Sequence, residues 1–165
     1  MSKKFTFETG IPLVVFGQST VANIFKGIYD MLGQNGADSL LYTAGRKTGR
    51  SYAEQQRKST EKKRIELLKK CTEGDEGARW GKFEYAIDFE TFEGEVRLYD
   101  SFLAKSWIEN IETEQKYPVC AFIAGYIAGI IESIFGKRVI VEEKECMALG
   151  NDYCVFKLRK GVLGE

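Results

Sequence analysis

The spacing of apolar residues predicts helices in the first part of the chain. Over 21–32 apolar residues recur every three to four positions, the period of an amphipathic helix, and glycines at 33–36 predict its end. A second helix is expected over 37–48 and a third over 53–71, before a loop at 73–77. In the second helix Gly45 and Gly49 share one face, spaced four apart, and would let a neighbouring element approach closely.

After residue 77 the period changes to two. Apolar and polar residues alternate over 82–90, which predicts a half-buried strand. Glu93-Gly94 predicts a tight turn, and Val96, Leu98 and Phe102 predict a second strand that completes an antiparallel hairpin.

A strongly apolar helix is predicted over 119–135, ending at Gly136. Gly125 and Gly129, with several alanines, make its surface small enough to sit tightly against a sheet. The stretch is shorter than the roughly 20 residues that a membrane-spanning helix needs. We therefore expect a buried core helix and no membrane span.

Alternation resumes near the C-terminus, where 139–143 and 154–158 predict the strands of a second hairpin around a turn at 149–152. The whole pattern predicts an α+β fold. It has N-terminal helices, a four-stranded antiparallel sheet made of two hairpins, and a buried small-residue helix between the hairpins. We divide the chain into three parts: an extended segment and helix at 1–36, one domain at 37–160, and a tail at 161–165.

The N-terminal part leaves its packing open. Its helix has a long apolar face, which could pack on a second subunit or on its own domain. The first residues, Met1 to Thr6, contain no long apolar run and do not resemble a secretory signal. We expect a cytoplasmic protein whose thiols stay reduced.

Composition argues against several function classes. The 165 residues include 24 basic and 24 acidic side chains, so the formal net charge is zero. Residues 46–70 carry ten basic side chains against three acidic ones; we interpret them as a solvated helix face, because no base-reading motif accompanies them, and do not expect nucleic acid as a partner. The chain has no histidine, which excludes His-assisted nucleophiles and imidazole metal ligands.

Three cysteines form a candidate metal site. Cys146 and Cys154 flank the turn of the second hairpin, and Cys120 lies at the N-terminus of the apolar helix, where the helix dipole favours a thiolate. Soft thiolate ligands select zinc over magnesium or calcium. Two other interpretations stay open: the cysteines are small buried apolar residues, or Cys146 and Cys154 form a disulfide in an oxidising compartment.

A carboxylate must complete such a site, because Cys71 is remote in this topology and histidine is absent. Glu143 lies on the inward-facing side of its predicted strand, whereas Glu142 points the other way and is the alternative. An ideal strand would place Cys146 opposite Glu143, so a bend or bulge is expected at 144–145.

The C-terminal third resembles the signature of the 4-vinyl reductase domain family. That likeness is carried by Cys120, the glycine-alanine helix after it, and the pattern Glu143-x-x-Cys146-x-x-x-Gly150-x-x-x-Cys154. Weaker likeness at 41–49 and 100–104 extends it over about 37–160. The family includes sensor domains of phenol- and xylene-responsive bacterial activators, and it is similar in fold to TRAPP vesicle-transport subunits.

The resemblance implies a ligand-binding module with a structural zinc ion, an apolar pocket between sheet and helices, and dimerisation through the N-terminal region. The implied zinc ligands are Cys120, Glu143, Cys146 and Cys154. Two departures stand out: the histidine that holds the phenol hydroxyl in the phenol sensors is absent, and Leu103 occupies a position that is often acidic.

We therefore expect a non-catalytic sensor or binding domain for an apolar or aromatic small molecule, acting as a homodimer. Its pocket walls are predicted from the first hairpin and its flank: Phe83, Tyr85, Phe89, Tyr99, Ser101, Phe102 and Trp107. The alternative is a TRAPP-like scaffold that holds a lipid chain or a partner in its groove. A reductase is less favoured, because Gly125 and Gly129 are separated by helix and not by a strand-to-helix phosphate turn.

Overall fold

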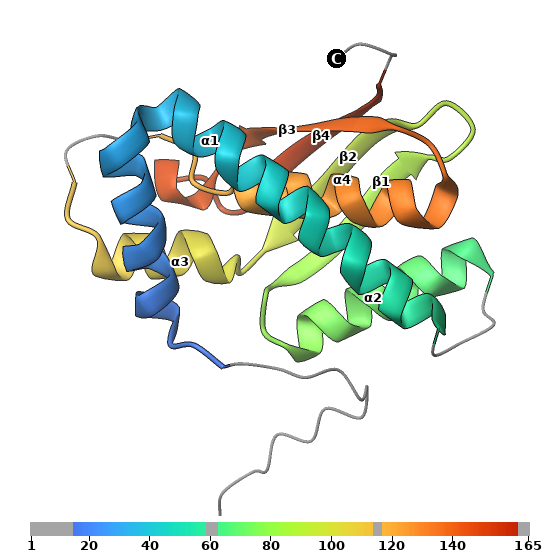
Figure 1. Cartoon of the computed structure of the whole chain (residues 1–165), viewed down its shortest axis with the longest axis horizontal. Coiled ribbons are helices and arrows are strands. Elements are labelled where there is room, and N and C mark those ends of the chain that lie inside the picture. Colours follow the sequence, from blue (N-terminus) through green and yellow to red (C-terminus); the bar gives the residue numbers. More distant parts are fainter. Residues whose placement is uncertain (1–14, 59–62, 114–116, 162–165) are drawn as a thin grey trace, which may run out of the picture.

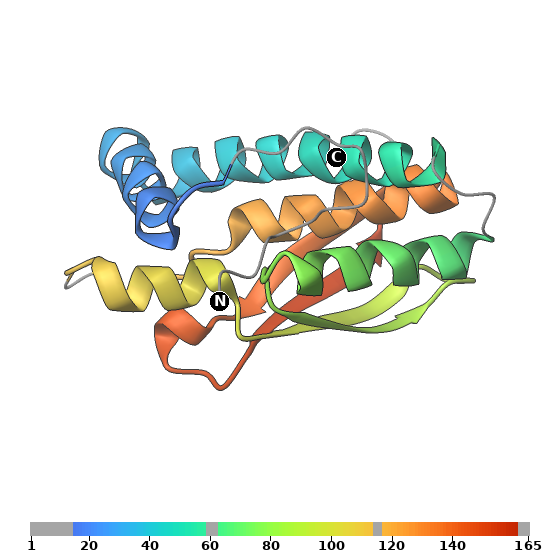
Figure 2. The ribbon, with the colours of Figure 1, turned by 90° about the horizontal axis from the view of Figure 1, so that it is seen from below.

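A computed structural model describes residues 15–58, 63–113 and 117–161. Four α-helices lie on one side of a four-stranded antiparallel sheet, and α4 lies between α1 and the sheet (Figures 1 and 2). The predicted α+β class is confirmed. No helix in the described part of the chain combines the length and apolar character that crossing a bilayer requires.

The sheet has the order β1-β2-β4-β3. Its strands are β1 (Lys82–Asp88), β2 (Glu93–Tyr99), β3 (Val139–Glu145) and β4 (Cys154–Lys160). Both predicted hairpins are present, and β2 joins them by pairing with β4. The tight turn expected at Glu93-Gly94 is wrong. Both residues belong to β2, and Glu93 pairs with Asp88, the last residue of β1.

The helices are α1 (Gln18–Lys58), α2 (Arg64–Gly77), α3 (Phe102–Asn110) and α4 (Ala121–Phe135). Gly33 interrupts α1 with φ 67° and ψ 174°, so the predicted end of the first helix is confirmed as a kink. Gly136 ends α4 in the left-handed conformation, as predicted.

The helix predicted over 53–71 is wrong: residues 53–58 complete α1, and α2 begins at Arg64. The loop predicted at 73–77 is also wrong, because Asp75 is buried and accepts a hydrogen bond from Tyr126, which holds this segment in α2. The second strand ends before Phe102, since Ser101 caps α3 by accepting a hydrogen bond from the Ala104 amide.

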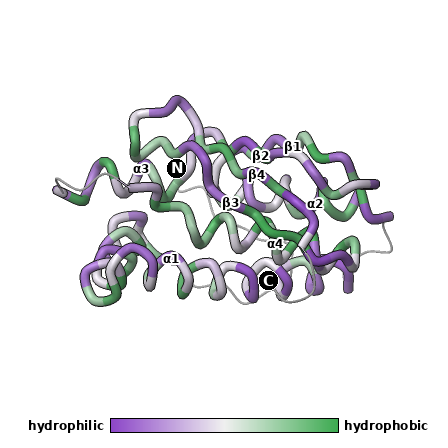
Figure 3. The backbone as a smooth tube through the Cα atoms, turned by 90° about the horizontal axis from the view of Figure 1, so that it is seen from above, coloured by the Kyte–Doolittle hydropathy of each residue, from purple (hydrophilic) through white to green (hydrophobic). Residues whose placement is uncertain are grey.

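The core centres on α4, most of whose residues are buried. Figure 3 shows this hydrophobic segment running beside α1. The glycines of α4 face α1 and not the sheet: a Cβ on Gly125 would lie 2.0 Å from the Tyr42 carbonyl oxygen, and one on Gly129 would lie 2.1 Å from that of Arg46. Gly45 makes the reciprocal approach to Phe122, so the predicted role of the α1 glycines is confirmed.

Candidate metal centre and ligand-binding residues

Cys120, Glu143, Cys146 and Cys154 converge in the structure. Their candidate ligand atoms all lie within 4.8 Å of one another. The Cys154 Sγ is 3.9 Å from the Cys120 Sγ and 4.0 Å from the Cys146 Sγ. Three separate parts of the fold supply the cluster: the residue before α4, the end of β3, and the start of β4.

Local backbone features of the second hairpin bring three of the residues together. The β3–β4 register shifts between Glu143 and Glu145, which confirms the bulge that the sequence predicts. The turn that follows is held by two bonds: the Cys146 amide donates to Asn151 Oδ1 at 3.3 Å, and the Met147 amide donates to Cys154 Sγ at 3.4 Å. The bulge turns Cys146 toward the same side as Glu143.

Glu143 has one oxygen engaged and one without a partner. Its Oε2 accepts a 2.8 Å hydrogen bond from the Cys120 amide. Its Oε1 is buried and has no hydrogen-bond partner within the described ranges. Glu142 lies outside the cluster and forms a 2.5 Å ion pair with Lys144. The orphaned Oε1 is thus the carboxylate atom available to a cation.

The distances fit zinc better than a disulfide. Tetrahedral zinc with Zn–S bonds of about 2.3 Å requires sulfur atoms about 3.8 Å apart, and the two sulfur–sulfur distances are close to this value. A disulfide requires sulfurs about 2.05 Å apart, and all four cysteines are free thiols. The donor set of three sulfurs and one carboxylate oxygen therefore fits zinc in number, spacing and softness.

The pKa values of the clustered groups are shifted in different directions. Hydrogen bonding with Cys120 and Cys146 lowers the pKa of Cys154 to about 5. Hydrogen bonding with Cys146 and Cys154, followed by burial, raises the pKa of Cys120 well above its usual value. Burial, and then the negative charge of Cys146, raises the pKa of Glu143. The four groups lie so close together that their negative charges oppose one another. A bound cation would let all four ionise.

Two further residues are placed relative to the cluster. Cys71 is buried in α2 and does not belong to the group of four, as expected. Burial raises the pKa of its thiol to about 12. Ser101, predicted as a polar anchor for the ligand, lies 3.6 Å from the Cys120 Sγ and so contacts this group of four residues, the candidate metal cluster.

Five of the seven predicted pocket walls lie in or against one hydrophobic core: Phe83, Tyr85, Phe89, Phe102 and Trp107. Phe83 and Tyr85 stack at 6.4 Å between ring centroids, and Phe89 stacks on Phe135 at 4.5 Å. Tyr99 packs against Tyr153, with ring centroids 5.0 Å apart.

Two of the predicted walls, Phe102 and Trp107, belong to α3. Phe102 packs on Trp80, and Trp107 packs on Tyr29 and Tyr117. A ligand role for all of these residues stays a prediction.

The sequence did not indicate a buried carboxylate beside α4. The Tyr126 hydroxyl donates a 2.6 Å hydrogen bond to Asp75 Oδ1, and the Trp80 ring lies 4.8 Å from the Tyr126 ring. Burial raises the pKa of Asp75 to about 7. Asp75 looked like a loop residue because two glycines flank its acidic segment, and nothing local in the sequence indicates that Tyr126 faces it.

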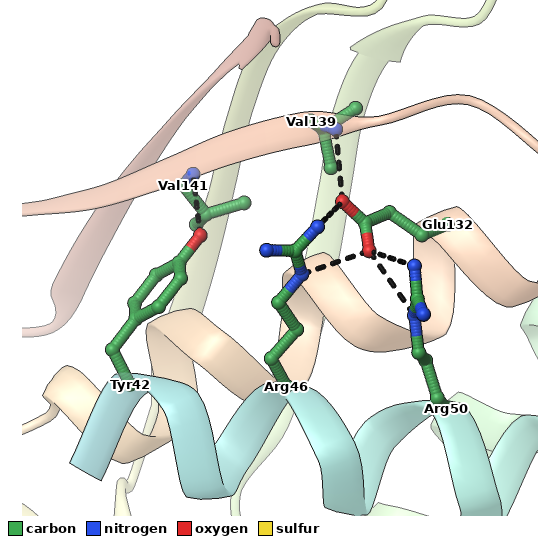
Figure 4. Close-up of polar contacts among 6 residues, drawn as sticks. All are labelled: Tyr42, Arg46, Arg50, Glu132, Val139 and Val141. Atoms are coloured by element: carbon green, nitrogen blue, oxygen red, sulfur yellow. Dashed lines mark hydrogen bonds and ion pairs between the residues drawn. The ribbon is translucent and has the colours of Figure 1, made fainter. Parts of the chain in front are cut away.

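A second buried carboxylate, Glu132, lies near the end of α4 (Figure 4). It accepts hydrogen bonds from the guanidinium groups of Arg46 and Arg50, at 2.6 to 3.2 Å, and one from the Val139 amide. The Tyr42 hydroxyl accepts from the Val141 amide at 3.3 Å. Side chains of α1 thus cover the outer edge of β3.

A cavity of about 540 Å³ lies between α1, α4 and β3. Tyr42, Arg46, Ala124 and Val141 are among the residues that line it, and Glu143 borders it at one end. Its size is within the range of small-molecule sites.

Comparison with known proteins supports the likeness. Residues 95–160, which include all four residues of the metal cluster, match the model of the 4-vinyl reductase domain. The uncharacterized protein MJ1460 of Methanocaldococcus jannaschii is 30% identical over 157 residues, which cover 91% of this chain and 80% of that protein.

Two solved structures share the fold. The phenol-responsive sensory domain of the transcription activator PoxR, solved with phenol, superposes with a TM-score of 0.71 at 22% identity, covering 90% of this chain and 76% of that one. A trafficking protein particle complex subunit 3 from Naegleria fowleri, covalently bound to palmitic acid, superposes with a TM-score of 0.64 at 13% identity, covering 88% and 95%.

Proposed function

Because the chain belongs to the 4-vinyl reductase domain family, we propose that it is a non-catalytic domain that binds an apolar or aromatic small molecule. We also propose that it contains a structural zinc site. The observation that carries the ligand-binding part is the fold shared over 90% of the chain with a sensory domain solved with phenol. The chain lacks histidine, so a ligand would be held by other polar groups.

The zinc ion would be held by Cys120, Glu143, Cys146 and Cys154. Three observations support this assignment: the convergence of the four groups, their sulfur spacing, and the orphaned oxygen of Glu143. With four protein ligands the metal would have no open position for water, and it would tie the second hairpin to the start of α4. We therefore assign it a structural role.

Native mass spectrometry of gently purified protein tests both parts of this proposal. We expect one zinc ion per chain, lost with Cys146→Ser and kept with Cys71→Ser. We also expect a bound small molecule, or one that binds reversibly when phenols and other arenes are added. A protein that carries no zinc after expression in zinc-supplied cells, and binds none of the arenes, would contradict the proposal.

We also propose a homodimer formed by the part of α1 before Gly33. This part exposes apolar side chains, with Ile24 51% and Met31 85% exposed. Ile24→Glu should shift the mass measured by light scattering from dimer to monomer. Ile65→Glu, at a position 55% exposed on α2, is the matched control and should leave the dimer intact.

The second candidate is a scaffold that holds a lipid chain permanently, as the likeness to the palmitate-bound trafficking subunit suggests. Cys71 is the thiol of the described chain that lies outside the metal cluster. Mass spectrometry of the denatured protein distinguishes the candidates, because a covalent acyl chain would survive denaturation and disappear in Cys71→Ser. The free thiols fit a reducing compartment, and we propose the cytoplasm.

A further inference from the structure

The cavity between α1, α4 and β3 is a groove with regular walls. One wall consists of α1 residues spaced four apart, which therefore share one face of the helix: Gln34, Asp38, Tyr42 and Arg46. This row spans about 18 Å at the helical rise. The opposite wall is β3 with Arg138 before it, and the start of α4 forms the remaining wall.

The two ends of the groove have opposite charge. At one end a second cavity of about 370 Å³ shares Arg46 and Arg138 with the groove, and its lining has four cationic side chains against one carboxylate. That carboxylate, Glu132, is already occupied by two arginines and the Val139 amide. Lys137 is exposed, and no ion pair joins it to a carboxylate of the described residues.

The opposite end is acidic, and its carboxylates have partners. Asp38 accepts a 2.7 Å hydrogen bond from Tyr29, Glu142 pairs with Lys144, and Glu143 belongs to the metal cluster. Between the two ends the lining is apolar: Pro118, Ala121, Ala124, Val139 and Val141. The groove is therefore an apolar channel with a positive end.

Two hydrogen-bond donors mark where a negative group would lie. Arg46 uses Nε and Nη2 on Glu132, and Figure 4 shows its remaining terminal nitrogen directed toward Tyr42. The Tyr42 hydroxyl accepts a hydrogen bond from the Val141 amide, and its own hydrogen has no acceptor among the described residues. A carboxylate between Tyr42 and Arg46 would satisfy both donors.

We propose that this groove binds a small molecule with an apolar body and a carboxylate head, the head lying at Tyr42 and Arg46 and the body along Ala124 and Val141. The inference rests on the proposed small-molecule function and gives its ligand a chemical class. Lys137 and Arg138 contribute the surrounding positive field and need not touch the head.

Calorimetric titration of the zinc-loaded protein with three probes of equal length tests the charge requirement. The probes are 4-phenylbutyrate, 4-phenylbutanol and 4-phenylbutylamine. We expect the acid to bind about tenfold more tightly than the alcohol, and the amine to bind most weakly, since one charge-assisted bond separates the probes. Equal binding of acid and alcohol, tighter binding of the amine, or no binding of any probe would overturn the inference.

Variants and chemical-shift mapping test the location. Lys137→Glu combined with Arg138→Glu should weaken binding of the acid about tenfold, and Tyr42→Phe should weaken it severalfold. Lys47→Glu, a charge reversal on the same helix outside the groove lining, is the control. Amide shifts confined to the region of Trp80 and Tyr126 would refute the groove yet leave the small-molecule function standing.

Discussion

Acidic groups lie in the interior at both ends of α4, and their surroundings differ. At its N-terminal end three thiols and Glu143 are gathered in a buried cluster without a cationic side chain among them. At its C-terminal end Glu132 is buried too, but it accepts hydrogen bonds from Arg46, Arg50 and a backbone amide. One centre is complete within the chain, whereas the other lacks a positive charge.

This difference indicates what each centre is for. A buried carboxylate with two guanidinium partners fixes the position of α1 on α4 and needs nothing from outside. A set of potential anions with a carboxylate oxygen that has no partner depends on an added cation. We therefore expect removal of the metal to destabilise the N-terminal end of α4. The C-terminal end should be destabilised only by mutation.

The largest effect should come from breaking the metal cluster. Cys154→Ser should release zinc and lower the unfolding free energy by on the order of 5 kcal/mol, because metal binding and folding are coupled. The Cys71→Ser variant changes another buried thiol and should lose about 1–2 kcal/mol with its zinc retained. Zinc content and urea unfolding measure both, and equal losses in the two variants would remove the distinction between them.

Glu132→Gln should cost about 3 kcal/mol, because it leaves two arginines facing a neutral amide in a partly buried place. Arg50→Gln should cost less than about 1 kcal/mol, since Arg50 is 53% exposed at its side chain and Arg46 keeps its own bonds to Glu132. Zinc content should not change in either variant. A loss of zinc in Glu132→Gln would show that the two ends are not independent.

How much of each centre can be predicted from the sequence depends on how far apart its residues lie in the chain. Cys146 and Cys154 are eight residues apart on one hairpin, and the bulge beside Glu143 follows from the geometry of a strand, so most of the metal cluster could be inferred. Glu132 and Arg46 are 86 residues apart, and nothing in the sequence pairs them. The basic segment that contains Arg46 therefore looked like a solvated surface.

The aromatic residues show the same limit. Alternation identifies which residues share a face of a strand, but it does not say what covers that face. Phe83 and Tyr85 stack on each other, as same-face neighbours should, whereas Tyr99 packs on Tyr153 from the second hairpin. That pairing depends on β2 lying beside β4, a choice of strand order that periodicity does not encode.

Between the two ends, close packing of backbones joins α1 to α4. A Cβ on Gly129 would lie 2.1 Å from the Arg46 carbonyl oxygen, so Gly129→Ala should separate the helices and cost about 2 kcal/mol. Gly27→Ala is the control, because nothing lies within 4 Å of that position and alanine favours helix. It should stabilise the protein by less than about 1 kcal/mol in the same unfolding experiment.

Asp75 gives a third outcome for a buried carboxylate, because within the described residues its side chain is hydrogen-bonded to Tyr126 and not to an arginine. Its pKa is raised to about 7 by burial, while in the unfolded chain it returns to about 4. The stability that Asp75 contributes is therefore full below about pH 4 and is lost as the pH rises through about 7, with a slope of at most about 1.4 kcal/mol per pH unit. Asp75→Asn should remove this slope and nothing else. The difference in unfolding free energy between wild type and Asp75→Asn, measured at about pH 5 and about pH 8, isolates it because the metal cluster titrates identically in both proteins. A difference that does not change with pH would mean that burial does not raise the pKa of Asp75 in the folded state.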